Sequence, residues 1–341
     1  MSYNPLASLH PESPTLIDEA RRISESIVMG ETGDNSYFSD IARSVCEAFM
    51  LSALERNAAN METVLDLAFA SPKTFAEQLL PIMQESTAFD GLLSQLANQI
   101  EGLSGEGGQA IWSTLRRSLN VFQSPLIRAA LAPSDVDFSR MKNEVVTVFI
   151  VLPATRLSRY GRYLRLMISM MIAALLDSRK PDFPVLFLVD EAAALGNLPM
   201  LSDGVALFRG YSIKLWLYWQ SLDQLQSTYP DKWQTFLANS VKQVFGLNDF
   251  AGAKYFSEYM GNRTQQVESK SVSGDLLGGG SNISEIQRPL MAPDEAMRLP
   301  KNQELLLLER QFPIKATKLE YFTDSEFAGR FDADPYQTGG K

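Results

Sequence analysis

From residue 145 onward, short apolar runs of strand length alternate with stretches that carry apolar residues at helical spacing. Runs that are apolar almost throughout are typical of parallel strands buried on both faces. Alternation of strand and helix indicates a parallel sheet covered by helices. We therefore predict an α/β fold for this part of the chain, with strands at residues 145–152, 185–189, 213–219, 241–247 and 304–308.

The first third of the chain is predicted to be helical, because its apolar residues recur at spacings of three and four. Asp, Ser, Gly and Pro separate the expected helices, and no convincing strand precedes residue 140. We therefore expect an all-α domain before the sheet. Its predicted helices cover residues 16–28, 37–55, 61–70, 73–84, 89–100 and 109–122.

Between the predicted strands, we expect helices at residues 160–176, from 191 to about 208, at 222–237 and at 252–260. The polar Ser/Gly-rich stretch 264–288, with the core SGDLLGGGSN, is predicted to be a flexible loop. Within this stretch, the segment 274–280 lacks the adjoining Lys and helix of a phosphate-binding loop. The polar tail, residues 325–341, is predicted to be frayed.

Composition narrows the possible functions. The net charge of −9 does not favour phosphate-rich partners, so DNA contact requires a local basic patch. Cys46 is the single cysteine, so the chain cannot form an internal disulfide. His10 is the single histidine, so we expect no metal site with His or Cys ligands. No run approaches the roughly 18 apolar residues of a membrane-spanning helix, so this chain alone is expected to be soluble.

The sequence VLFLVDEAAALG holds the sharpest candidate site, because a predicted buried strand ends in Asp190 and Glu191. Side chains at the carboxyl end of a parallel strand emerge into the ligand crevice of the sheet. One acid can hold a hydrated Mg²⁺, and the next can orient an attacking water. The alternative is that both acids simply open the next helix, where carboxylates favour the helix dipole.

Two further polar residues lie near this predicted edge. The next strand along the chain ends in Gln220 and Ser221, and an amide there can sense a γ-phosphate; alternatively, Ser221 caps a helix. Arg209 stands at a predicted helix end, where it can reach the nucleotide of a neighbouring subunit. The alternative for Arg209 is a cation that stabilises a helix C-terminus.

A third group of charges follows the first predicted strand. Its four arginines are spaced by three and interleaved with tyrosines, which suggests a surface for DNA or for a neighbour's phosphates. The alternative is an ordinary solvated helix face. These residues are Arg156, Arg159, Arg162 and Arg165.

The chain resembles the coupling proteins of type IV secretion, the TraG/TraD family, over nearly its whole length. The matching blocks come in the family's order and spacing, which is far more specific than any single block. They are YNPL (3–6), GDNSYFSDIAR (33–43), PLIRAALAPSDVDF (125–138), DEAAALGNLPML, LFRGYSIKLWLYWQSLDQL, WQTFLANS and FGLND.

The resemblance implies a RecA-like P-loop NTPase fold, hydrolysis of ATP with Mg²⁺, a homohexameric ring and an anchor in the bacterial inner membrane. Asp190 and Glu191 are similar to the family's Walker B pair, with Asp190 on the metal side. Gln220 resembles its γ-phosphate sensor, and Arg209 its subunit-bridging arginine. The resemblance also implies four segments: a lead-in to the motor domain (1–36), an all-α domain (37–135), a RecA-like motor domain with Walker B (136–324) and a polar tail (325–341).

One departure from the family pattern is large. The Walker A loop, GxxxxGK[ST], is absent, and the nearest candidate, residues 30–36, has no Lys. We therefore expect the chain to be a fragment, with the loop, its strand and the membrane anchor encoded upstream. Without that strand, two inner strands lose a partner and expose apolar edges.

Three functions follow from these features. The first is the motor of a coupling ATPase that recruits and pumps relaxase-bound single-stranded DNA, or a protein substrate, into the type IV secretion channel at the cytoplasmic face of the membrane. The second is a non-catalytic docking module that binds relaxase or an accessory protein. The absent Walker A loop favours the second for the isolated chain, and the retained acids favour the first. A chromosome-handling ring translocase is a third, weaker reading.

Overall fold

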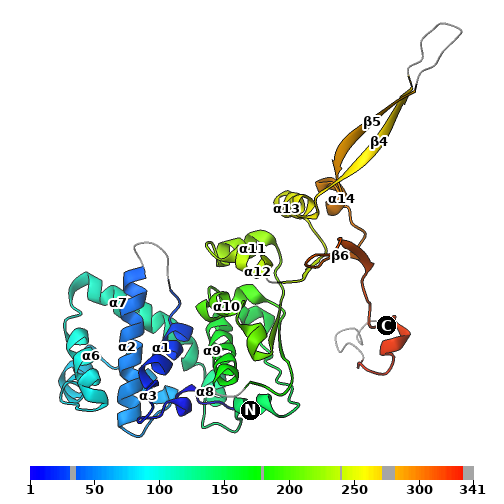
Figure 1. Ribbon diagram of the computed structural model, residues 1–341. Coiled ribbons are helices and arrows are strands. Elements are labelled where there is room, and N and C mark those ends of the chain that lie inside the picture. The colour runs from blue at the N-terminus through cyan, green and yellow to red at the C-terminus, as the bar shows by residue number, and fades with distance from the viewer. Residues whose placement is uncertain (31–35, 178–179, 239, 271–280, 333–341) are drawn as a thin grey trace, which may run out of the picture. The chain divides into compact units, whose positions relative to one another are not determined.

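The computed structural model describes residues 1–30, 36–177, 180–238, 240–270 and 281–332. The chain divides into two compact units, Met1–Gln220 and Ser221–Lys341, each described here by itself (Figure 1). The division falls inside the segment 136–324 that the resemblance assigns to the motor domain.

The first unit begins with helices, and its described residues contain no strand before position 185. Its helices are α1 (Leu16–Ile27), α2 (Ser36–Glu55), α3 (Met61–Phe69), α4 (Pro72–Thr74), α5 (Leu80–Gln84), α6 (Leu92–Glu101), α7 (Gly105–Leu119), α8 (Pro125–Ala130), α9 (Leu157–Leu176) and α10 (Pro199–Gly204).

Helix α2 is the centre of the bundle. Its second half is buried almost all round, as expected for a helix that is apolar on every face and has neighbours on several sides. Helices α1, α3, α6 and α7 pack against it (Figure 1). Phe49 of α2 meets Phe75 edge to face at 5.7 Å between ring centroids, and Phe75 meets Trp112 of α7 at 5.2 Å. Each buried aromatic ring of this kind stabilises the fold by about 2 kcal/mol.

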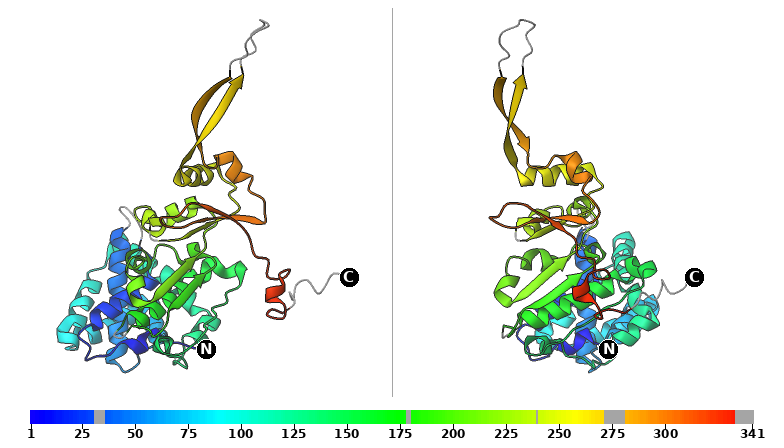
Figure 2. Two further views of the ribbon diagram at one scale, coloured as in Figure 1. Left: turned by 45° about the vertical axis from the view of Figure 1, so that its right-hand side comes forward. Right: turned by 90° about the vertical axis from the view of Figure 1, so that its right-hand side faces the viewer.

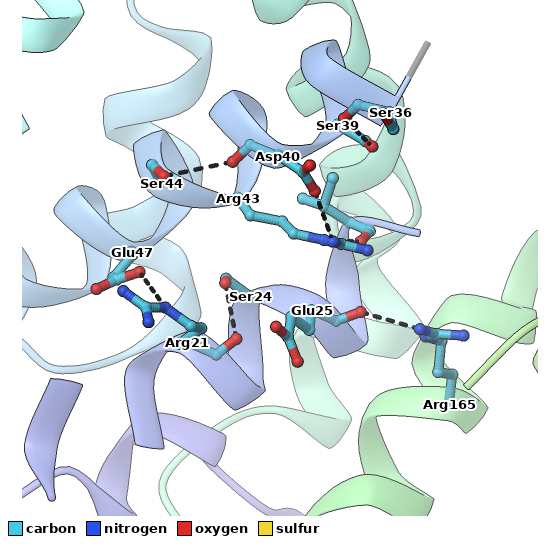
Figure 3. Close-up of polar contacts among 11 residues, drawn as sticks. Arg21, Ser24, Glu25, Ser36, Ser39, Asp40, Arg43, Ser44, Glu47 and Arg165 are labelled. Carbon is cyan, nitrogen blue, oxygen red and sulfur yellow. Dashed lines mark hydrogen bonds and ion pairs between the residues drawn. The ribbon is translucent and has the colours of Figure 1, made fainter. Parts of the chain in front are cut away.

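Polar contacts tie α1 to α2 (Figure 3). The guanidinium Nε of Arg21 lies 3.7 Å from the carboxylate of Glu47, whose side chain is almost fully buried. Arg43 of α2 donates through Nε to the carbonyl oxygen of Val28, at the C-terminal end of α1, at 3.0 Å. The two helices are therefore joined along their length as well as through apolar packing.

The sheet of the first unit has two parallel strands, β1 (Val185–Val189) and β2 (Ile213–Leu217), in register from the pair Val185 and Ile213 to the pair Val189 and Leu217. Both strands were predicted. The expected helix from 191 to 208 is instead three short pieces: η8 (Ala192–Leu195), α10 and η9 (Phe208–Tyr211). Gly196, with a φ of 60°, ends the first piece, in a conformation that favours glycine.

The predicted strand at 145–152 is wrong. These residues form no strand, and Val145, Phe149 and Val151 are 93%, 81% and 85% exposed. A strand requires a neighbour for its backbone N–H and C=O groups, and no described strand pairs with this segment. The apolar pattern is present, but its partner is not among the described residues.

The second unit holds helices α11 (Leu222–Thr228), α12 (Trp233–Ala238), α13 (Phe250–Met260) and α14 (Pro293–Met297). Its three-stranded sheet has the order β3 (Lys242–Val244), β6 (Gln303–Leu307) and β7 (Ile314–Thr317), and both pairings are antiparallel. The strands predicted near 241–247 and 304–308 therefore exist, but the expectation that they join a parallel sheet is wrong. Val244, Phe256, Leu305 and Leu307 form a small core beneath them.

The flexible loop predicted at 264–288 is also wrong for its described parts. Strands β4 (Asn262–Lys270) and β5 (Ser281–Pro289) pair antiparallel along their whole length and form a long ribbon (Figure 2). Backbone hydrogen bonds build this ladder regardless of how polar the side chains are. The glycine-rich core, 271–280, lies outside the described residues, as does most of the predicted frayed tail. No helix in the described part of the chain combines the length and the apolar character needed to cross a membrane.

Candidate nucleotide-side edge of the parallel sheet

The candidate site lies at the carboxyl ends of β1 and β2. Beyond the paired strands, Tyr218 donates its backbone N–H to the carbonyl oxygen of Val189 at 3.0 Å, and Ala192 donates to the carbonyl oxygen of Tyr218 at 3.0 Å. These two bonds extend the pairing past the ends of both strands. The acids that follow β1 and the amide that follows β2 therefore leave the sheet at one edge.

Gln220 and Glu191 meet at this edge. The side-chain amide Nε2 of Gln220 donates to Oε2 of Glu191 at 2.8 Å. Glu191 is partly buried, whereas Asp190 is exposed. The sequence placed these residues at the ends of neighbouring strands, and the geometry brings two of the three into direct contact.

Helix α9 holds the segment that follows the two acids. A Cβ atom at Gly161 would lie 2.4 Å from the carbonyl oxygen of Ala194, so only glycine allows this close approach. One turn further, the fully buried Arg165 donates to the carbonyl oxygens of Leu195, at 3.1 Å, and of Asn197. Contacts from α9 thus hold the backbone of η8 and of the residues that follow it in place.

Arg165 also donates to the carbonyl oxygen of Glu25 in α1 at 3.0 Å (Figure 3). The expectation that Arg165 faces DNA is therefore wrong, because its guanidinium is buried and donates hydrogen bonds to backbone carbonyl oxygens. The sequence signal that could have revealed this role is an arginine inside the apolar helical run LRLMISMM.

The other three arginines of this series do not form one face. A spacing of three falls about 60° short of a full turn of the helix at each step, so within α9 Arg159 and Arg165 point about a third of a turn apart, and Arg156 precedes the helix. Arg156 and Arg159 are exposed, and Arg156 lies 3.5 Å from the hydroxyl of Tyr160. Arg162 is half-buried. The predicted basic stripe is thus distributed around the helix.

Arg209 lies in η9, just before β2, and is exposed. Its side chain makes no hydrogen bond or ion pair with another residue in the part of the chain that the structure describes. It therefore lies within reach of solvent or of a neighbouring molecule, and its bridging role stays a prediction.

The residues at this edge fit one half of a magnesium–nucleotide site. Mg²⁺ prefers oxygen ligands and is usually held by one or two carboxylates together with waters, which Asp190 and Glu191 can provide. No cluster of three or more His, Cys, Asp or Glu side chains capable of holding a metal occurs among the described residues. The Lys and the hydroxyl that grip the phosphates in a Walker A loop are not supplied by the sequence.

Comparison with known proteins settles the family. The profile described as Type IV secretory system Conjugative DNA transfer matches residues 1–336, and the chain belongs to this family. It is 27% identical over 340 residues to the protein VirD4 of Rhizobium rhizogenes, covering 94% of this chain and 49% of that protein. It is 30% identical over 216 residues to the conjugal transfer protein TraG of Escherichia coli, covering 57% of this chain and 34% of that protein. The chain spans about half the length, or less, of these relatives.

The solved structures confirm the predicted fold class. The unbound bacterial conjugative coupling protein TrwB superposes with a TM-score of 0.70 at 14% identity, covering 93% of this chain and 70% of TrwB. TrwB in complex with ADP and Mg²⁺ gives a TM-score of 0.69, with the same identity and coverage. The chain therefore shares the α/β, RecA-like fold of this coupling protein.

Proposed function

We propose that this chain is the motor part of a coupling ATPase that recruits relaxase-bound single-stranded DNA, or a protein substrate, and pumps it into a type IV secretion channel. The observation that carries the proposal is the 2.8 Å hydrogen bond from Gln220 to Glu191 at the carboxyl edge of two parallel strands. In the whole protein, this part works as a homohexamer at the cytoplasmic face of the bacterial inner membrane, held by an upstream anchor.

Each residue at the edge has a chemical task. Asp190 would hold hydrated Mg²⁺ when magnesium–ATP is bound, and Glu191 would accept a hydrogen bond from the attacking water and orient it. Magnesium–ATP supplies the phosphoryl group and the free energy. Gln220 can hydrogen-bond either Glu191 or a γ-phosphate, so its amide links the state of the nucleotide to the acid that positions water. Arg209 stabilises charge on the nucleotide of a neighbouring subunit.

The proposal is tested by changing Glu191 to Gln at the chromosomal or plasmid locus that encodes the chain. The amide keeps the size of the side chain and removes its charge. We expect the frequency of conjugative transfer to fall by roughly a hundredfold or more, in line with the loss of a general base. Glu12→Gln, which changes an exposed acid far along the chain, is the matched control. Unchanged transfer with Glu191→Gln would refute the motor proposal.

The docking module remains the second candidate because the helical part contains a large cavity, of about 1090 Å³. In that case transfer would survive Glu191→Gln and Gln220→Ala, and would be lost when the residues that line the cavity are changed. The same transfer measurement therefore separates the two functions.

A further inference from the structure

The cavity lies within the first unit, between α7, the turn after α3, the C-terminal end of α6 and the N-terminal end of α9. Its volume of about 1090 Å³ is at the upper limit of the 300–1,000 Å³ typical of small-molecule pockets. It is therefore large enough for a short segment of polypeptide rather than a single free ion.

Arginines dominate the charge of the cavity. Four of them line it, and Glu101 is the only acid among the lining residues. The whole chain carries a net charge of −9, so this is a local reversal of sign. An anionic partner would be attracted to this place and repelled by most of the remaining surface. The four are Arg116, Arg117, Arg159 and Arg162.

Of the four arginines, Arg162 would gain most from a bound anion. Its Nε is buried and has no hydrogen-bond partner among the described residues. Burial lowers the pKa of Arg162, and the neighbouring charge of Arg117 lowers it further. A partly buried guanidinium with a like charge nearby and an unsatisfied donor is unfavourable, and a carboxylate would relieve both costs.

The rest of the cavity wall mixes polar and apolar side chains, and its apolar part includes the packed rings of Phe75 and Trp112. Trp112 meets Phe75 edge to face, and the guanidinium carbon of Arg116 lies 5.3 Å from the centre of the Trp112 ring. Arg116 is itself held by the carbonyl oxygen of Ala68, at 2.8 Å from Nε. A nucleic-acid site needs open ring faces on which bases stack, whereas this wall suits an inserted apolar side chain. Leu80, Ile100, Leu103 and Val121 belong to the same apolar part of the wall.

We propose that this cavity binds an acidic peptide segment of a partner protein, with one apolar side chain against Trp112 and Phe75 and a carboxylate paired with Arg162. Arg117 and Arg159 receive further acidic groups of the same segment. The site lies outside the nucleotide edge and requires no ATP, so it adds a recruitment surface to the proposed motor. The mode of recognition is the capture of an acidic motif by a cluster of arginines.

The experiment uses the full chain, without nucleotide, as bait for a phage library of random short peptides. A parallel selection uses the variant that combines Arg159→Gln and Arg162→Gln. We expect the full chain to enrich peptides that combine Asp or Glu with Phe, Leu or Trp, and the variant to lose this enrichment. A selected peptide, labelled and titrated by fluorescence anisotropy, should bind Arg162→Gln at least roughly tenfold more weakly, as for loss of a desolvated charge pair.

Three controls make the outcome decisive. Arg128→Gln changes an arginine outside the cavity and should leave the peptide affinity unchanged. Arg159→Gln alone changes an exposed side chain that the fold does not require, so a weaker affinity in this variant cannot be ascribed to misfolding. No enrichment, enrichment of basic peptides, or equal enrichment by the double variant would overturn the proposal. Displacement of the peptide by oligothymidine, with the same dependence on Arg162, would assign the cavity to nucleic acid instead. Because ATP plays no part, these results are independent of the transfer test of Glu191.

Discussion

Gly161 and Arg165, four residues apart on α9, support the segment that leaves β1 after Asp190 and Glu191. Gly161 allows the helix backbone to approach the carbonyl oxygen of Ala194, and Arg165 binds the next carbonyl oxygens along the chain. Neither residue can contact a nucleotide phosphate from this buried position. They are positioning residues for the site rather than parts of its chemistry.

Gly161→Ala tests this support directly. The added Cβ would lie 2.4 Å from the carbonyl oxygen of Ala194, so α9 or η8 must move. We expect a loss of about 1–3 kcal/mol in the free energy of unfolding, the usual cost of overpacking a core. Gly107→Ala is the matched control in α7, because a Cβ there meets no atom within 4 Å, and alanine favours helix. Thermal melts of both variants measure the difference. Equal melting temperatures would contradict the close approach of Gly161 to the carbonyl oxygen of Ala194.

Glu47 gives a prediction about pH. Burial raises the pKa of this carboxyl, Arg21 opposes the shift, and Asp18 and Glu25 add to it. A carboxyl whose pKa is raised in the folded state binds protons more tightly when folded. Its contribution to stability is therefore present below the ordinary carboxyl pKa of 4.5 and is lost as the pH rises through the folded pKa.

Glu47→Gln should consequently raise the melting temperature at neutral pH and flatten the decrease in stability between pH 4.5 and neutrality. The partner, Arg21, is 58% exposed and can be solvated after the change. Melts across this pH range, with the exposed Glu62→Gln as control, measure the effect. A lower melting temperature at neutral pH would show that the ion pair with Arg21 outweighs the burial.

At the scale of helices and strands, the local patterns were informative where the partner of an element is close in sequence. The helices around α2 and the parallel pair β1 and β2 were predicted because the pattern of their own apolar residues indicates them. The segment 145–152 was wrongly predicted to be a strand. An apolar run is compatible with a strand, but it does not show that a neighbouring strand exists to pair with it. The polar ribbon of β4 and β5 was missed for the opposite reason, since backbone pairing leaves little trace in side-chain polarity.

The candidate site shows the same limit. The placement of Asp190, Glu191 and Gln220 at the ends of paired strands could be predicted because each follows a recognisable strand. The support from Arg165 was not found, because a spacing of three suggested one face of a helix, whereas the real rotation turns Arg165 inward. The cavity was not predicted at all, since its lining residues come from several helices that are distant in sequence.

The helical part should fold without the sheet. The contacts between α2, α3, α6 and α7 lie within residues 37–123, except that α1 also covers α2. We expect a piece covering 37–123 to be helical by circular dichroism and to melt cooperatively, and a piece covering 16–123 to melt at a higher temperature. A random-coil spectrum for both pieces at low temperature would be contrary to an independent domain.

For the molecule as a whole, the 341 residues carry the two acids proposed for a nucleotide site, Asp190 and Glu191, but no Walker A motif that would bind the phosphates. We predict that the purified chain releases no phosphate from ATP above the blank, because carboxylates alone bind Mg²⁺ but not the β- and γ-phosphates. A steady-state phosphate assay measures this. Turnover that disappears in Glu191→Gln would show that the chain completes a nucleotide site in another way.

Helix α9 carries two sets of residues with different tasks within three turns. Arg159 and Arg162 reach the cavity, while Gly161 and Arg165 hold the segment behind Asp190 and Glu191. A small shift of this rigid rod, produced by a peptide in the cavity, would be transmitted to the two acids without any intervening loop. Because such coupling is reciprocal, a ligand that stabilises the position of the acids would also raise the affinity for the peptide. Binding of a partner's peptide and hydrolysis of ATP would then be coupled through one helix.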